Sequence, residues 1–370
     1  MSKRIYIVLT SLHIGGITSV ISNQIDSFHK SGAEVHLVLF RHSSETTLPN
    51  NCKVHILDLH DRDAGIIPRL AYNILRGTHK GLGNPLSSFI YTRSMNNLIA
   101  REGEADGIFI HSIKACSSLR SFNHPKKVTI LHAIKSEMLA KHSGIALYIR
   151  RNAIRKTYTN SIIVAVSWEI KKDFMLSYNI PSERIHIIHN GIDTHAIKKK
   201  AKTYSPPVKA PYLVYIGRME KIKGPDILLT AFMSIKRNDL KLVFIGGGSL
   251  LNHLKERALN AEGKTIIFTG PLENPMPYLQ KATYSVMPSR SEGLGMSALE
   301  SLALETPVIA SDLDVFSEFE SEGLLFFKTE NHEDLTKKIE ELALNRPMPA
   351  QLSKKFDIAL SAKNYLNIIS

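Results

Sequence analysis

Residues 289–300 of the chain read SRSEGLGMSALE, and they follow a short apolar run at 284–287. The apolar run is typical of a buried strand, and the glycines at 293 and 295 are typical of a tight turn. Residues 296–304 are good helix formers. A strand, a glycine turn and a helix in this order leave unpaired backbone N–H groups at the helix N-terminus, where an anion can bind. The stretch therefore predicts one unit of an α/β fold with a ligand at its turn.

Two carboxylates, Glu292 and Glu300, frame this stretch. Glu292 falls in the turn, where it can face a ligand, and Glu300 falls about a turn and a half into the helix. They could reach opposite ends of one extended ligand. Taken alone, two glutamates at this spacing are more often solvated helix carboxylates, so the interpretation depends on the rest of the chain.

Strands and helices alternate along the whole chain, which predicts parallel, doubly wound sheets. Strands are expected at 5–9, 34–40, 53–57, 107–111, 127–131, 161–166, 185–189, 212–216, 241–245, 266–268, 284–287, 308–311 and 324–327. Helices are expected at 17–30, 145–158, 224–235, 275–281, 296–304, 334–344 and 351–369. Ligands of such sheets bind at the carboxyl ends of the strands, so we expect a site in a cleft between two domains.

The predicted fold class is α/β, with two Rossmann-like domains facing each other across that cleft. The expected organisation is a first domain at 1–197, a polar, proline-bearing linker at 198–211, a second domain at 212–350, and a helical segment at 351–370 that packs back on the first domain. Residues 58–89 are irregular and glycine-rich, which is typical of a functional loop.

The net charge of +13 is placed unevenly. Residues 1–205 carry 28 basic and 14 acidic side chains, a net charge of +14, so the remainder carries −1. This asymmetry indicates an anionic partner such as nucleic acid, a phosphorylated substrate or membrane headgroups; the alternative is a basic surface without a partner.

The composition also indicates the compartment. Cys52 and Cys116 match neither a disulfide framework nor a metal-ligand spacing, which favours a reduced cytoplasmic chain. The first nine residues are too short an apolar segment for a signal peptide, and no apolar run reaches the roughly 18 residues that a membrane span needs. We therefore expect a soluble or peripheral protein.

A second loop carries two cations. After the strand at 212–216 the chain reads GRMEKIKG, which places Arg218 at a strand end and Lys223 just before a helix. Two cations and a helix N-terminus can neutralise a diphosphate. Isolated cations on such a loop are more often solvated, but their position at the same sheet edge as Glu292 favours a joint site.

These motifs, in this order and spacing, resemble the retaining GT-B glycosyltransferases of the large bacterial family 4. The resemblance rests on Gly217-Arg218-x4-Lys223-Gly224, on Glu292-x7-Glu300, on Pro-Val-Ile-Ala-Ser at 307–311, on Asn-Gly-Ile-Asp at 190–193 and on the paired glycines at 15 and 16. It spans nearly the whole chain.

The resemblance implies a role for each motif residue. Arg218 and Lys223 would hold the diphosphate of a nucleotide-sugar donor, and Glu300 would accept its ribose hydroxyls. Glu292 would lie against the donor sugar, and His132 would hydrogen-bond it near the reacting carbon. The remaining implied contacts come from Gly15 and Gly16 to phosphate and from the backbone of Gly293, Leu294 and Gly295 to sugar and phosphate. The implied catalytic set is Glu292, His132, Arg218 and Lys223, with no cofactor and no bound metal.

The chain departs from the family pattern in two places. Glu305 stands where relatives usually carry glycine, and residues 312–318 lack the usual Gly-Gly-x-Pro-Glu character. These departures bear on the base and sugar end of the donor pocket. The triple glycine at 246–248 is not interpreted as a dinucleotide motif, because the third glycine of that motif is absent. The lysines at 198–202 are interpreted as a solvated hinge or membrane-facing loop, since no stacking aromatics are interleaved with them.

The predicted function is an enzyme of the hexosyltransferase type. It would move a hexose or N-acetylhexosamine from a nucleotide-diphosphate sugar, for which a UDP-sugar is the favoured candidate. The acceptor would be a saccharide or lipid-linked glycan in cell-surface polysaccharide or lipopolysaccharide synthesis. The acceptor would dock on the basic first domain, and nucleic acid is not an expected partner. The predicted location is cytoplasmic, with peripheral contact to the inner face of the membrane as a hypothesis. The alternatives are a nucleotide-sugar 2-epimerase on the same scaffold and a catalytically silent glycan- or nucleotide-binding protein.

Overall fold

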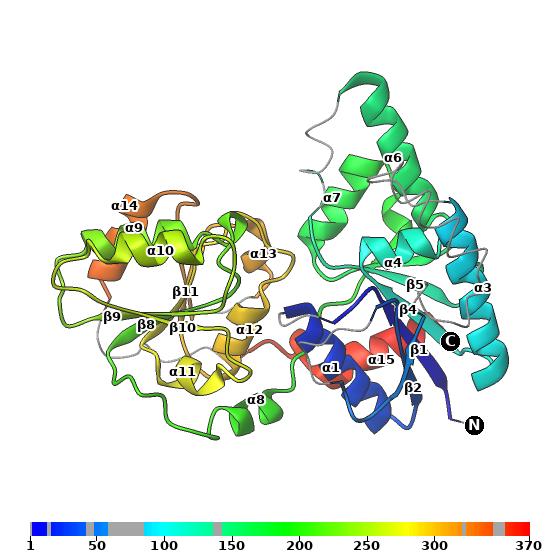
Figure 1. Ribbon diagram of the computed structural model, residues 1–370, viewed down its shortest axis with the longest axis horizontal. Coiled ribbons are helices and arrows are strands. Elements are labelled where there is room, and N and C mark those ends of the chain that lie inside the picture. The colour runs from blue at the N-terminus through cyan, green and yellow to red at the C-terminus, as the bar shows by residue number, and fades with distance from the viewer. Residues whose placement is uncertain are drawn as a thin grey trace. The chain divides into compact units, whose positions relative to one another are not determined.

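The computed structural model describes residues 2–12, 16–41, 48–57, 85–134, 136, 143–319, 323–342 and 352–370. The chain divides into two compact units (Figure 1). The first consists of Met1–Gly191 together with Ile358–Ser370, and the second of Ile192–Asp357. Among the described residues, no helix combines the length and the apolar content that crossing a bilayer requires.

The boundary between the units lies earlier than the predicted linker at 198–211. Helix α8 (Thr194–Lys200) occupies the first part of that region. Asp193 caps the helix, because its side chain accepts a hydrogen bond of 2.8 Å from the backbone N–H of Ala196. Residues 198–200 are therefore helical and belong to the second unit, and the chain returns to the first unit at 357/358.

The first unit contains a parallel sheet in the order β3-β2-β1-β4-β5-β6-β7. The strands are β1 (Arg4–Leu9), β2 (Glu34–Leu39), β3 (Lys53–Ile56), β4 (Gly107–His111), β5 (Lys127–Leu131), β6 (Ile162–Ala165) and β7 (Ile185–Ile187). Every residue of β4 and β5 is buried, as expected for central strands of a parallel sheet covered on both faces. The predicted doubly wound architecture is confirmed here.

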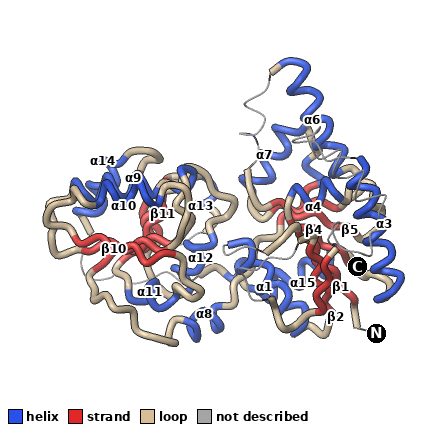
Figure 2. Tube along the Cα trace, in the orientation of Figure 1, coloured by secondary structure: helices blue, strands red, loops and turns tan. Residues whose placement is uncertain are grey.

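Helices cover both faces of this sheet (Figures 1 and 2). They are α1 (Gly16–Lys30) and α15 (Ile358–Ile368), which pack against each other, and α3 (Pro85–Glu102), α4 (Ile113–Ser118), α6 (Gly144–Tyr158) and α7 (Trp168–Tyr178). The start of α3 corrects the prediction that residues 58–89 are irregular: Pro85 opens the helix, a position where its missing N–H costs nothing. The rest of that stretch, 58–84, lies outside the described residues.

The second unit contains a parallel sheet in the order β10-β9-β8-β11-β12-β13. Its strands are β8 (Tyr212–Ile216), β9 (Lys241–Ile245), β10 (Thr265–Gly270), β11 (Tyr284–Met287), β12 (Val308–Ser311) and β13 (Leu324–Phe327). The helices α9 (Pro225–Ser234), α10 (Leu251–Ala258) and α14 (His332–Glu340) lie on one face, and α11 (Met276–Lys281) and α12 (Met296–Ala303) on the other (Figure 1). The order brings β8 and β11 together as neighbours, so the loops that follow them leave the sheet side by side.

Candidate functional site

Glu292 is held by the loops that follow β8 and β11. Its side chain is only 8% exposed, and both carboxylate oxygens have partners. Oε2 lies 2.7 Å from Lys223 Nζ, and Oε1 accepts a hydrogen bond of 2.7 Å from Ser289 Oγ. One cation and one hydroxyl donor offset the cost of burying this carboxylate and fix its position. The structure thus brings together Lys223 and Glu292, two of the predicted site residues.

Arg290 connects the turn that carries Glu292 to neighbouring segments through its side chain and its backbone N–H. Its two terminal guanidinium nitrogens each donate a 2.9 Å hydrogen bond to the carboxylate of Asp226 in the first turn of α9. Its Nε donates to Glu330 at 2.6 Å, and its backbone N–H donates to the carbonyl of Ile222 at 2.9 Å. The planar fork of arginine matches a carboxylate with two bonds, which lysine cannot do. Arg290 therefore ties the turn of Glu292 to the loop of Lys223.

We expect Arg290→Ala to lower the free energy of unfolding of the chain by about 2–3 kcal/mol, because Asp226 would lose its fork partner in a half-buried position. Urea unfolding measures this change. Arg237→Ala is the matched control, since Arg237 also pairs with an aspartate, at 3.1 Å, on the same unit. Donor cleavage should fall in the Arg290 variant and stay unchanged in the control. Equal activity in both variants would contradict a bracing role.

Arg218, the second predicted cation, is exposed at the end of β8. Its carbonyl accepts a 2.7 Å hydrogen bond from the hydroxyl of Tyr215. Burial and then the charge of Glu292 raise the pKa of Tyr215, so this phenol stays protonated and can hold the loop. Arg218 stands on the same loop as Lys223, between β8 and α9, and is exposed to solvent.

Glycines let the loops approach one another closely. Gly224 has φ +66°, and a Cβ placed on it would lie 1.8 Å from the carbonyl oxygen of Pro288. Gly246 has φ +137°, and a Cβ placed on it would lie 2.0 Å from the carbonyl oxygen of Gly217. Only glycine fits such positions. The triple glycine at 246–248 thus packs against the Arg218 loop.

The expected turn at 293–295 adopts the geometry of a helix start. Gly295 has φ +85° and is the N-cap of α12, and a Cβ on it would lie 2.7 Å from the ring of Phe316. Leu294 is buried, so its side chain packs into the second unit. The backbone N–H groups of the first helical turn lack intrahelical acceptors, which suits them to bind an anion.

Glu300 lies half-buried on α12, a turn away from the glycines. Burial raises its pKa from 4.5 to about 7, and the charge of Lys200 opposes that shift. A carboxylate with a pKa of about 7 is only partly ionised at neutral pH. Hydrogen bonds from hydroxyl groups favour its ionised form, so this side chain is suited to accept them.

This pKa predicts a pH dependence of stability. The folded chain binds the proton of Glu300 more tightly than the unfolded chain does, so the group stabilises the fold at low pH and loses that contribution as pH rises through about 7. The free energy of unfolding of the wild type, relative to Glu300→Gln, should fall by up to about 3 kcal/mol between pH 5 and pH 8. Chemical unfolding at several pH values measures this difference. A difference that does not change with pH would contradict the assignment.

The predicted residues of the first unit lie at the carboxyl edge of its own sheet. His132 follows β5 directly, and its Nε2 lies 2.8 Å from Nδ1 of His111, the last residue of β4. Burial lowers the pKa of His132 to about 4, so the ring is neutral at physiological pH. Its Nδ1 is the nitrogen that can face a ligand. Gly16 begins α1, and Gly15 lies outside the described residues.

The structure also resolves one departure from the family pattern. Glu305 adopts φ +61°, the left-handed conformation that a glycine would take at that place. Its carboxylate pairs with Lys198 of α8 at 2.8 Å, which helps to offset the cost of that conformation. The turn after α12 therefore keeps the expected shape.

Models of known protein families match both halves of the chain. Residues 14–196 match the family described as Glycosyltransferase Family 4, and residues 196–356 match the family described as Glycosyl transferases group 1. The chain belongs to the GT-B glycosyltransferases of family 4. The two matches meet at residue 196, close to the boundary between the two units.

Relatives of this glycosyltransferase have named activities. It is 23% identical to an N-acetylgalactosamine-N,N'-diacetylbacillosaminyl-diphospho-undecaprenol 4-alpha-N-acetylgalactosaminyltransferase of Campylobacter jejuni, over 84% of this chain and 81% of the relative. It is 30% identical to the O-antigen biosynthesis glycosyltransferase WclY of Escherichia coli, over 48% of this chain and 50% of the relative.

Solved structures share the fold of the glycosyltransferase. Anabaena HepE in complex with UDP and glucose has a TM-score of 0.70 at 17% identity, with 99% of this chain and 95% of that chain covered. The lipopolysaccharide outer core galactosyltransferase WaaB, in its apo form, has a TM-score of 0.66 at 18% identity, with 99% of each chain covered.

Four residues around the site were not predicted from the sequence: Ser289, Arg290, Tyr215 and His111. Ser289 and Arg290 stand inside the stretch that was singled out. The partner of Ser289 is Glu292 in the same stretch, whereas the side-chain partners of Arg290 come from elsewhere in the chain. His111 is the last residue of a predicted strand, and His132 directly follows the next predicted strand. That both strands end at one edge of the sheet could have predicted that the two histidines lie close together.

Proposed function

We propose that this glycosyltransferase moves a hexose or N-acetylhexosamine from a UDP-sugar to a saccharide acceptor, with retention of the anomeric configuration. The observation that carries the proposal is the pairing of Glu292 with Lys223 at 2.7 Å, with the exposed Arg218 on the same loop as Lys223. A carboxylate suits the sugar that develops positive charge, and cations suit the departing phosphate.

The residues divide the chemistry between them. The bond from the sugar C1 to the phosphate oxygen breaks, its electron pair stays on the nucleoside diphosphate, and a bond from C1 to the acceptor oxygen forms. The acceptor's proton passes to the departing phosphate. Arg218, Lys223 and the start of α12 would stabilise the negative charge, and Glu292 would orient the sugar. Glu300 would accept the ribose hydroxyls, Gly15 and Gly16 would contact phosphate, and His132 would hydrogen-bond the donor sugar. No cofactor or metal is needed for these steps.

Lys223 has a double task in this proposal. In the absence of donor it neutralises the buried Glu292. A diphosphate next to an unpaired carboxylate would be repelled, so a cation between them is required for the donor to bind. The lysine can contact both groups at once because an ammonium has three donors.

The donor and acceptor classes are proposed from the relatives. HepE binds UDP in the solved complex, which supports a UDP-sugar. The Campylobacter relative is named for a diphospho-undecaprenol acceptor and WclY for O-antigen synthesis, which supports a lipid-linked glycan in cell-surface polysaccharide or lipopolysaccharide synthesis. The proposed location is the cytoplasm, at the inner face of the membrane.

A thermal-shift panel of the purified chain against UDP-, GDP-, ADP- and CMP-sugars tests the donor. One UDP-sugar should stabilise the wild type and lose this effect in Lys223→Ala. NMR of the transfer product should show the anomeric configuration of the donor. Recovery of the donor as an epimer would establish an epimerase instead, and binding without turnover would indicate a silent binding protein.

Helix α6 carries the surface for membrane contact in this proposal. Ile145, Tyr148 and Ile149 are 80%, 68% and 52% exposed. They share the helix with Arg150, Arg151, Arg155 and Lys156. Exposed apolar side chains beside cations are typical of a helix that binds anionic lipid headgroups. Binding to anionic vesicles should weaken with salt and with Ile145→Ser; equal binding to neutral vesicles, or none to anionic ones, would contradict it.

A further inference from the structure

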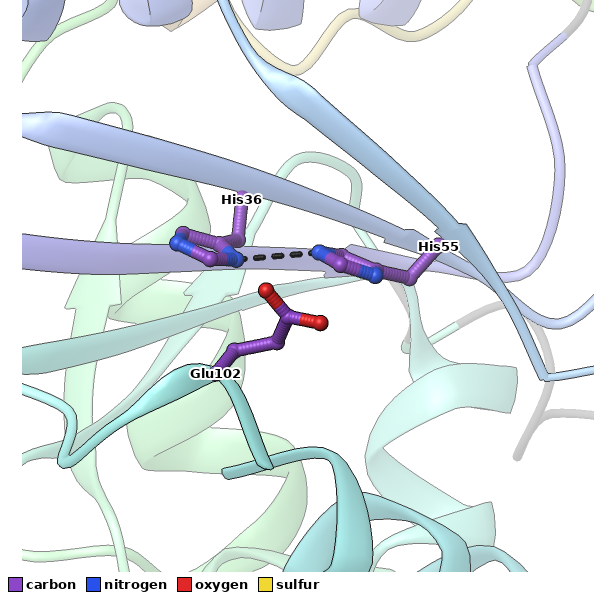
Figure 3. Close-up of side chains that lie close together, drawn as sticks. All are labelled: His36, His55 and Glu102. Atoms are coloured by element: carbon purple, nitrogen blue, oxygen red, sulfur yellow. Dashed lines mark hydrogen bonds between the residues drawn. The ribbon is translucent and has the colours of Figure 1, made fainter. Parts of the chain in front are cut away.

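A cluster of two histidines and a glutamate lies on the first unit, where β2, β3 and the end of α3 meet (Figure 3). One nitrogen of His36, one nitrogen of His55 and one carboxylate oxygen of Glu102 all lie within 4.8 Å of one another. We propose that these three residues form a binding site for one divalent cation of the zinc class. The ligand set is two imidazoles and a carboxylate, with a fourth position open to water.

The two rings already place one nitrogen each at the same gap. His36 Nδ1 and His55 Nε2 face each other at 2.9 Å, and the ring planes differ by 8°. The carboxylate of Glu102 is directed toward the gap between them (Figure 3). Two nitrogens bound to zinc at tetrahedral geometry are about 3.3 Å apart, so the nitrogens need to move apart by about 0.4 Å and the rings need to tilt until both lone pairs point at the ion. The ion would replace the proton that the two nitrogens now share.

A second carboxylate orients the buried ligand. The Nε2 of His36 lies 3.3 Å from Oε1 of Glu34, which favours the tautomer with its proton on Nε2 and its lone pair on Nδ1. The ring of Tyr6 stacks on the ring of His36, with the ring centroids 4.6 Å apart, and helps to fix its orientation. Carboxylate partners of this kind are the usual support of metal-bound histidines.

The site lies within β2 and β3, where His36 is the third residue of one strand and His55 the third of the other, whereas His111 is the last residue of β4. The transfer chemistry is proposed at the carboxyl edge, so the ion has no part in it. Its effect would be structural. β3 is an edge strand of which no residue is fully buried, and an ion bound to His55 would tie it to β2 and α3.

Two cations now compete for the same carboxylate. Lys53 Nζ lies 4.0 Å from Oε2 of Glu102, and Arg101 Nε donates to Oε1 at 3.0 Å. Their side chains are 58% and 69% exposed, so both can turn into solvent when an ion binds. Removal of the Lys53 charge should therefore tighten metal binding several-fold.

The test is a zinc titration of the tag-free full chain, stripped with a chelator, in competition with a chromophoric chelator. We expect one zinc per chain and a rise in melting temperature. His55→Gln and Glu102→Gln should each weaken binding about 100-fold or more, and Glu34→Gln about 10–100-fold. Cobalt in place of zinc should give the visible absorption of a four-coordinate site. His36 itself is not substituted, since it is 0% exposed and its loss could prevent folding.

His124→Gln is the matched control, because His124 lies 3.5 Å from Glu104 in a histidine–glutamate pair that has no third ligand among the described residues. This variant should bind zinc like the wild type. The proposal is overturned if the wild type retains no zinc at micromolar concentration. It is equally overturned if zinc binding survives in both His55→Gln and Glu102→Gln. The result does not bear on donor binding, which uses other residues.

Discussion

Replacing Lys223 with alanine is expected to lower kcat/KM for donor cleavage about 10²–10³-fold. Removing one preorganised cation or donor at a site of developing charge typically costs that much. The loss should appear in donor binding as well, because the buried Glu292 would then face the diphosphate without a cation between them. Steady-state kinetics with the donor found in the panel measure both effects.

The same variant should also be less stable, by about 3 kcal/mol, since it leaves a buried carboxylate without its charge partner. The double variant Lys223→Ala with Glu292→Gln separates the two effects. It removes the unpaired charge, so stability should return while activity stays lost. Because Glu292→Gln alone is expected to lower kcat, the double variant is compared with that single variant; equal kcat/KM in the two would show that Lys223 serves the fold alone.

Replacing Glu292 with glutamine is the second large expected effect. The amide keeps the shape of the side chain and can still accept the hydrogen bond of Ser289, but the negative charge next to the sugar is gone. Binding of the nucleoside diphosphate should stay the same or tighten, because Lys223 is released from its ion pair. The kcat should fall about 10²–10³-fold.

Isothermal titration with the nucleoside diphosphate, together with single-turnover donor cleavage, measures this split between binding and chemistry. Asp239→Asn is the matched control, since Asp239 pairs with an arginine on the same unit away from the site. It should change neither quantity. A Glu292→Gln variant with unchanged kcat would show that the carboxylate has no role in the reaction.

Local sequence pattern was enough to predict most strands and the turns that follow them. The strand–glycine–helix order at 284–304 reads directly from apolar runs and glycines, and the structure places β11, its glycine turn and α12 there. Family membership followed from the spacing of Arg218, Lys223, Glu292 and Glu300. The pairing of Lys223 with Glu292 could be expected once β8 and β11 were placed as neighbours.

Non-local partners could not be predicted in the same way. Arg290 contacts Asp226, which is 64 positions earlier in the chain, and nothing in the local pattern distinguishes this arginine from a solvated one. The ligands proposed for zinc are also far apart, at positions 36, 55 and 102, without a recognisable spacing. The start of α3 and the extent of α8 were missed because their polar and glycine-rich surroundings hide the helical period.

The most direct test of the proposed donor site is ³¹P NMR of the purified chain incubated with a UDP-sugar and no acceptor. Slow hydrolysis should release UDP in the wild type, and the UDP signal should grow at least about 100-fold more slowly in Lys223→Ala. Such a result would place cleavage of the sugar–phosphate bond at the Lys223–Glu292 pair. If the wild type released UDP and Lys223→Ala released it at the same rate, the site would lie elsewhere in this glycosyltransferase.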